Sequence, residues 1–168
     1  LKHPVRMSAP IRHLIRTEEY AELVFSDGQR ERFDAVVLGT HADEALKMLE
    51  APSKAEQDLL GAWSYQKNDV VLHSDVSAMP KTRRAWASWN FVREHGGDDQ
   101  DPVTLTYDMN RLQGIQSEVP YLVSLNRRSE YDPGKVIDRT VLTHPVFSRS
   151  ALKSQPLLPK LNGTHRTW

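Results

Sequence analysis

The chain has 168 residues, of which 39% are hydrophobic and 26% charged, values typical of a soluble globular domain large enough to bury a core. Its 22 basic residues balance 22 acidic residues, which disfavours nucleic-acid binding because that function normally needs a net basic field. No apolar run approaches the ~20 residues that span a bilayer. The lack of cysteine excludes disulfides, thiolate metal ligands and a cysteine nucleophile. This composition fits a reducing compartment, so we expect a cytoplasmic protein.

The first residues, Leu1 to Pro4, include neither an initiator methionine nor an apolar targeting segment. The sequence therefore reads as an internal piece of a longer protein, although a processed complete chain is equally compatible with it. Short apolar patches between Val5 and Arg16, interrupted by Pro10, predict one or two short strands.

A hairpin is predicted next. Tyr20 to Phe25 is strand-like, Asp27-Gly28 is a turn signal, and Gln29 to Phe33 would return antiparallel. Asp34 to Gly39 is a nearly continuous apolar run, which predicts a strand covered on both faces.

Two helices should follow. Thr40 with Asp43 resembles a capping box before an apolar stripe that Pro52 ends. Ser53 with Glu56 is a second capping box, and it predicts a helix to about Gly61.

The remainder of the chain is mostly β-like. Residues 103–109 alternate between apolar and polar side chains, which is typical of a strand in a sheet with one buried face. Residues 94–101 predict an exposed hairpin loop, Asp132-Pro133-Gly134 predicts a turn, and residues from Ser148 onward are weakly patterned, like a peripheral connection. Further strands are predicted at Val70 to His73, Ala85 to Phe91 and Tyr121 to Asn126. This order of elements predicts an α+β fold.

Local motifs for other chemistries are weak. The seven histidines have no close metal-ligand spacing, so no metal site is predicted. His73-Ser74-Asp75 contains the residue types of a hydrolase triad, but consecutive strand residues point to alternating faces. No glycine has another glycine two positions away, which excludes a self-sufficient Rossmann domain with the G-x-G-x-x-G fingerprint.

Phe33-Asp34-Ala35-Val36-Val37-Leu38-Gly39-Thr40-His41-Ala42-Asp43 resembles the strand-to-helix segment of flavin-containing amine oxidoreductases, in particular predicted NAD/FAD-binding amine-oxidase-like proteins. The resemblance covers nearly the whole chain. Its further matches are His3-Pro4-Val5-Arg6, Leu72-His73-Ser74-Asp75, Trp86-Ala87-Ser88-Trp89-Asn90, Thr106-Tyr107-Asp108-Met109-Asn110, Leu125-Asn126-Arg127 and His144-Pro145-Val146-Phe147.

The resemblance implies an internal fragment with three parts. Residues 1–62 would supply partial elements of an FAD-binding, Rossmann-like domain, residues 63–147 a mixed or antiparallel substrate-binding sheet with helices, and residues 148–168 a connection toward a C-terminal flavin motif. Residues near the cofactor would be Val5, Gly39, Thr40 and His41. The family's Gly-rich phosphate loop would lie upstream, so we expect this segment to bind no flavin tightly.

The implied function is that of a substrate-binding part of an FAD-dependent oxidoreductase that transfers a hydride from a small or apolar substrate to FAD. The parent would be the enzyme, and the isolated segment would be inactive. No catalytic base is assigned. Candidate pocket residues are Trp89, Asn90, Tyr107 and Asn110, although strand alternation prevents all four from facing one pocket. The alternative is a non-enzymatic ligand-binding or protein-interaction domain. Surface normally covered by the FAD domain would favour self-association.

Overall fold

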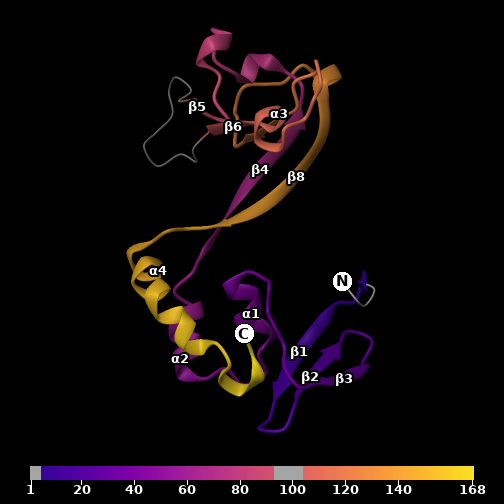
Figure 1. The fold of residues 1–168 in the computed structure, drawn as a ribbon, viewed down its shortest axis with the longest axis vertical. Coiled ribbons are helices and arrows are strands. Elements are labelled where there is room, and N and C mark those ends of the chain that lie inside the picture. The colour runs from indigo at the N-terminus through magenta and orange to yellow at the C-terminus, as the bar shows by residue number, and fades with distance from the viewer. Residues whose placement is uncertain (1–4, 93–103) are drawn as a thin grey trace. The chain divides into compact units, whose positions relative to one another are not determined.

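The computed structural model describes residues 5–92 and 104–168, which form two compact units (Figure 1). Unit 1 comprises Leu1–Tyr65 and Pro145–Trp168, and unit 2 comprises Gln66–His144. Helices and two antiparallel sheets, one of three strands and one of five, confirm the α+β fold. The predicted loop at residues 94–101 lies outside the described residues. Within the described residues, no helix is long and apolar enough to cross a membrane.

Unit 1 begins with an antiparallel sheet in the order β1-β2-β3, formed by β1 (Ile11–Arg16), β2 (Ala21–Phe25) and β3 (Arg30–Phe33). The predicted Asp27-Gly28 turn is confirmed. Gly28 adopts a positive φ of 87°, which glycine tolerates, and the Asp27 carboxylate accepts the Gln29 N–H at 2.9 Å.

The helices α1 (Ala42–Met48) and α2 (Lys54–Leu60) follow. The Ser53–Glu56 capping box is confirmed: Ser53 Oγ accepts the Glu56 N–H at 3.3 Å, and Glu56 Oε2 accepts the Ser53 N–H at 2.7 Å. The Thr40 prediction is one residue early. His41 is the N-cap of α1, and its N–H donates to the Glu44 carboxylate at 3.3 Å.

The predicted strand at Asp34 to Gly39 is not covered on both faces, and Val37 is 78% exposed. A single parallel bridge joins Val36 to Thr167. Around it, the Val36 and Leu38 N–H groups donate to the carbonyls of Arg166 and Trp168. An apolar run shows that a segment suits burial, but whether it is buried depends on the elements packed against it.

The core of unit 1 is small and is tied to a buried ion pair. Leu14, Ala21 and Leu49 are almost fully buried together. Beside them, the Arg16 guanidinium donates to both carboxylate oxygens of Glu56, and both side chains are only 5% exposed. Burial alone would raise the pKa of Glu56, but hydrogen bonds from Arg16 and Ser53 outweigh it and lower the pKa to about 2.

The end of the chain is more ordered than a weakly patterned connection. The helix α4 (Arg149–Ser154) is capped by Ser148, whose Oγ accepts the Ala151 N–H at 3.1 Å. Two 3₁₀ helices follow, η4 (Gln155–Leu161) and η5 (Thr164–Arg166). The prolines and the short 3₁₀ turns give no helical periodicity in the sequence, which explains why its pattern is weak.

The sheet of unit 2 has the order β5-β6-β7-β4-β8. Predicted strands correspond to β4 (Tyr65–His73), β5 (Trp89–Val92), β6 (Thr104–Asp108) and β7 (Leu122–Leu125). Two differences stand out. The start of the predicted strand at Ala85 is instead the 3₁₀ helix η2 (Arg83–Ala85), and the long edge strand β8 (Val136–Pro145) was not predicted. The remaining short elements are α3 (Met109–Gln113), η1 (Val76–Ala78) and η3 (Pro133–Lys135).

The buried Arg16–Glu56 pair should be the largest single polar contribution to unit 1. Replacing Arg16 with Met leaves the Glu56 carboxylate buried without its cation, so Arg16→Met should lower the free energy of unfolding by about 3 kcal/mol. Urea unfolding measures this loss. Arg6, which is 59% exposed and paired with Glu31, provides the control. Arg6→Met should cost less than about 1 kcal/mol, and equal losses in the two variants would contradict the assignment.

Candidate functional site

The five-stranded sheet has an apolar face defined by two in-register rows. The strand pairings place Trp89, Tyr107, Val123 and Leu72 directly opposite one another in the first row. The second row consists of Phe91, Leu105, Leu125 and Val70. Because facing residues of neighbouring strands point to the same side, these eight side chains form one surface, here called the apolar face.

Aromatic side chains at one end of the apolar face are strongly exposed. Trp89 is 66% and Phe91 63% exposed. The rings of Trp89 and Tyr107 meet edge to face, with centroids 6.2 Å apart and planes at 81°. Val70 and Leu125 of the second row are buried, so the exposed part of the apolar face lies toward β5. Exposed apolar surface of this kind normally marks a ligand-binding wall or an interface.

The opposite face of the sheet is buried and carries polar side chains beside Val71 and Leu122. The alternation predicted at residues 103–109 is present, but Thr104, Thr106 and Asp108 are the buried members and their apolar neighbours are not. Thr106 and Ser124 share a hydrogen bond of 2.7 Å. Thr104 Oγ1 donates to the Asn126 carbonyl, and the Asp108 carboxylate accepts the Arg111 N–H from α3, so these polar groups have partners that offset the cost of burying them.

His73 and Ser124 lie at the centre of this buried face, 2.8 Å apart between Nε2 and Oγ. The pair resembles a base and a nucleophile, but the histidine tautomer is wrong for that role. His73 Nδ1 accepts the Asp75 N–H at 3.1 Å, so in the neutral ring the proton lies on Nε2. His73 therefore donates to Ser124 and has no lone pair there with which to take its proton.

The Asp75 carboxylate does not orient His73. Its carboxylate accepts the backbone N–H groups of Ser77 at 3.0 Å and Asp132 at 2.9 Å. Burial would raise the pKa of Asp75, but these hydrogen bonds lower it to about 2. His73, Ser74 and Asp75 thus form no catalytic triad. Asp75 instead ties the segment after β4 to the segment before β8.

Two of the four predicted pocket residues lie together. Trp89 and Tyr107 share the apolar face, whereas Asn90 points to the buried side and is 5% exposed. The Asn90 amide donates to the Ala87 carbonyl at 2.7 Å and accepts the Ala87 N–H at 3.0 Å. Asn90 therefore shapes the entry to β5.

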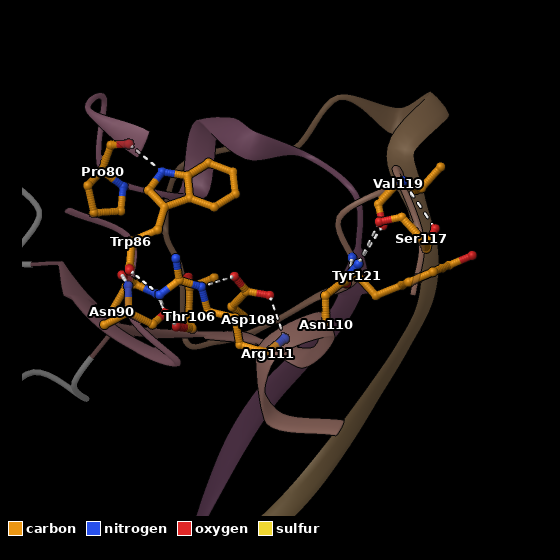
Figure 2. Close-up of polar contacts among 11 residues, drawn as sticks. Pro80, Trp86, Asn90, Thr106, Asp108, Asn110, Arg111, Ser117, Val119 and Tyr121 are labelled. Carbon is orange, nitrogen blue, oxygen red and sulfur yellow. Dashed lines mark hydrogen bonds and ion pairs between the residues drawn. The ribbon is translucent and has the colours of Figure 1, made fainter. Parts of the chain in front are cut away.

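The fourth predicted pocket residue, Asn110, clamps a loop (Figure 2). Its amide nitrogen donates to the Val119 carbonyl at 2.9 Å, and its oxygen accepts the Tyr121 N–H at 2.7 Å. Figure 2 also shows Arg111 contacting both Asp108 and the Trp86 carbonyl. The amide nitrogen and oxygen of Asn110 are thus bonded to Val119 and Tyr121 of the same chain and do not point at a ligand.

The four predicted cofactor residues lie in unit 1 but do not form one cradle. Val5 is 64% exposed in the N-terminal segment. Gly39 and Thr40 follow the Val36 bridge, and a Cβ at Gly39 would meet no atom within 4 Å. The His41 ring stacks on Tyr65, with centroids 4.3 Å apart.

The start of α1 does not fit the pyrophosphate of FAD. The first N–H groups of α1 are already used, because His41 donates to Glu44 and Ala42 donates to the Tyr65 hydroxyl at 2.7 Å. Asp43 and Glu44 add negative charge to the same turn.

Sequence reasoning missed the second row of the apolar face and the His73–Ser124 pair. Phe91 and Leu105 were each expected in strands, but grouping them needs the strand order. A residue 51 positions away supplies the partner of His73. No local spacing signals such a contact. In the described parts of the chain, no cluster of histidine and acidic side chains is arranged to hold a metal.

No family model matches the chain, and no curated protein matches it. Among solved structures, the chain is similar to one described as a CLA-producing fatty acid isomerase from P. acnes, with a TM-score of 0.62 and 12% sequence identity. That similarity covers 100% of this chain and 43% of the other, so the chain spans less than half the length of the structure it matches. At this identity the likeness concerns the fold alone.

Protonation of His73 should destabilise the protein in mild acid. Burial, with a smaller contribution from Arg127, lowers the pKa of His73 from 6.5 to about 4. Between those values the unfolded chain binds a proton that the folded chain does not, so stability falls as the pH drops below 6.5. From pH 7 to pH 5 the free energy of unfolding should fall by about 2 kcal/mol through this residue.

Urea unfolding at the two pH values measures the change, and pH 5 stays above the range in which Glu56 and Asp75 titrate. His73→Gln should remove most of the pH dependence, whereas His165→Gln, at an exposed site, should retain it. An unchanged slope in His73→Gln would refute the role given to His73.

Proposed function

We propose that this chain is the substrate-binding segment of a flavin-dependent oxidoreductase of the amine-oxidase type. The observation that carries the proposal is the apolar face, an eight-residue wall with exposed Trp89 and Phe91 at one end. Such a wall suits a small or apolar substrate, and its edge-to-face Trp89–Tyr107 pair would restrict how that substrate lies.

Unit 1 supplies a second line of support. Residues 36–38 pair in parallel with residues 166–168, and Gly39 and Thr40 follow at the carboxyl end of that pair. Ligands of α/β folds bind at the carboxyl ends of parallel strands. The 78% exposure of Val37 also suits a strand that another part of a longer protein would cover.

In the parent, a bound FAD would accept a hydride from the substrate. The residues described here would bind and orient the substrate and exclude water, while the phosphate cradle would come from elsewhere. The structural neighbour is described as acting on a fatty acid, a molecule with a long apolar chain, and this agrees in kind with an apolar wall.

A non-catalytic ligand-binding domain is the second candidate. The apolar face favours it in one respect, because neither of its two rows contains an acidic or basic side chain. Trp89 and Phe91 would also suit self-association of the segment.

The decisive experiment compares this chain with the product of the complete reading frame around it. We expect the longer product to carry flavin, visible in its absorbance spectrum, and the 168-residue chain to bind added FAD weakly or not at all. Stop codons immediately on both sides, or a colourless full-length product, would overturn the proposal. Tight FAD binding by the 168-residue chain would contradict the proposal that the phosphate cradle comes from another part of the parent protein.

The wall itself is tested in the flavin-containing product with linoleate and benzylamine as probes, by anaerobic bleaching of the flavin band. For a probe that bleaches it, Trp89→Ala should raise the half-saturating concentration about tenfold, with the flavin content unchanged. Leu112, 43% exposed on α3 and outside the apolar face, provides the control Leu112→Ala. Equal effects of the two variants would argue against the wall.

A further inference from the structure

Unit 1 contains a cavity of about 380 Å³ that is separate from the apolar face of unit 2. Three stretches of the chain enclose it, at residues 38–49, 56–65 and 158–168, with Pro145 at its margin. Its walls are mainly aliphatic and aromatic, including Leu38, Leu49, Leu60, Trp63, Leu161 and Trp168. Pockets of roughly 300–1,000 Å³ with such walls are typical of small-molecule sites.

Two tryptophans of the wall are held in place by other contacts. The Trp63 indole N–H donates to Ser154 Oγ at 3.0 Å, which fixes its ring between α2 and α4. The Trp168 ring lies against Gly163, where a Cβ would come within 3.3 Å of it. The cavity is therefore largely preformed, which reduces the entropy lost when a ligand binds.

The cavity is electrically neutral at its side chains. Glu56 is the one ionisable acid among the lining residues, and Arg16 neutralises it through two hydrogen bonds. The Tyr65 hydroxyl oxygen accepts the Ala42 N–H and keeps its own O–H to donate, and Thr167 Oγ1 donates to the His165 carbonyl at 3.1 Å. An ion entering this space would lose hydration without gaining a counter-charge.

Asn162 supplies a polar group with both a donor and an acceptor. It lines the cavity and is exposed, so it lies at the mouth, and its side-chain amide makes no hydrogen bond within the described residues. An amide can both donate and accept, so it suits an alcohol, ketone or amide group of a ligand.

We propose that this cavity binds a neutral, largely apolar small molecule of roughly 12 to 20 non-hydrogen atoms. The apolar part of the ligand lies among Leu49, Leu60 and Leu161, and one neutral hydrogen-bonding group meets Asn162 at the mouth. The site is independent of the proposed substrate wall, because every lining residue belongs to unit 1.

The test uses the 168-residue chain and prodan, a neutral naphthyl ketone whose emission shifts to the blue in apolar surroundings. We expect saturable binding that Leu161→Trp weakens at least about tenfold by filling the cavity. Leu152→Trp makes the same change on α4, at a 50% exposed position that does not line the cavity, and should leave the Kd within about twofold. Circular dichroism checks folding, and Thr40→Trp at the rim is the second blocking variant.

Two comparisons decide where and what the protein binds. Trp89→Ala should leave prodan binding unchanged, because that side chain belongs to the apolar face of unit 2. Anilinonaphthalene sulfonate, an anion of similar shape, should show no component that Leu161→Trp abolishes. Unaltered prodan affinity in folded Leu161→Trp and Thr40→Trp, loss of binding in Trp89→Ala, or tighter cavity binding of the anionic dye would each overturn the proposal.

Discussion

The buried hydrogen bonds on one side of the five-stranded sheet determine which side faces outward. His73, Thr106 and Ser124 satisfy one another there, and Asp75 closes the adjoining loops through backbone N–H groups. With the polar groups buried in this way, the alternate residues of the same strands are placed on the other side. Polar satisfaction permits this orientation, since unpaired polar groups could not be buried at acceptable cost, and Val71 and Leu122 add apolar burial on the same side.

Unit 1 depends on a different buried polar contact. The Arg16–Glu56 pair joins β1 to the start of α2, and Glu56 also completes the capping box with Ser53. One carboxylate thus fixes a strand, a helix start and part of a cavity wall. Because Arg16 compensates its charge, the adjoining space remains suited to neutral ligands. The two units therefore offer different sites, the apolar face in unit 2 and a neutral cavity with an open mouth in unit 1.

Local features of the fold were readable from the sequence. The Ser53–Glu56 box and the Asp27-Gly28 turn act within four residues, so their physics is present in the local pattern. The long-range contacts that determine which residues are buried could not be predicted from the sequence. The alternation at Thr104 to Asp108 indicated a strand, but its buried side depends on Ser124 and on His73, which lie far away in the chain.

The candidate site was partly predictable for the same reason. Trp89 and Tyr107 were chosen as aromatic strand residues, and strand pairing brings them together. Asn90 and Asn110 were predicted in the same pocket, but both amides bond to neighbouring backbone, at Ala87 and Tyr121. The sequence does not predict the edge strand β8, because its mostly exposed residues do not alternate between apolar and polar side chains. Edge strands often have such a composition, which protects them from aggregation. The flavin assignment rests on family resemblance and stays a prediction.

The orientation of the sheet can be measured directly by hydroxyl-radical footprinting of the 168-residue chain, with oxidation at each residue quantified by mass spectrometry. The apolar face requires rapid oxidation of Trp89, which is 66% exposed, and protection of Tyr131, which is 8% exposed beside His73. Relative to the unfolded chain, Trp89 should lose little reactivity and Tyr131 most of it. A protected Trp89 together with a reactive Tyr131 would contradict the account.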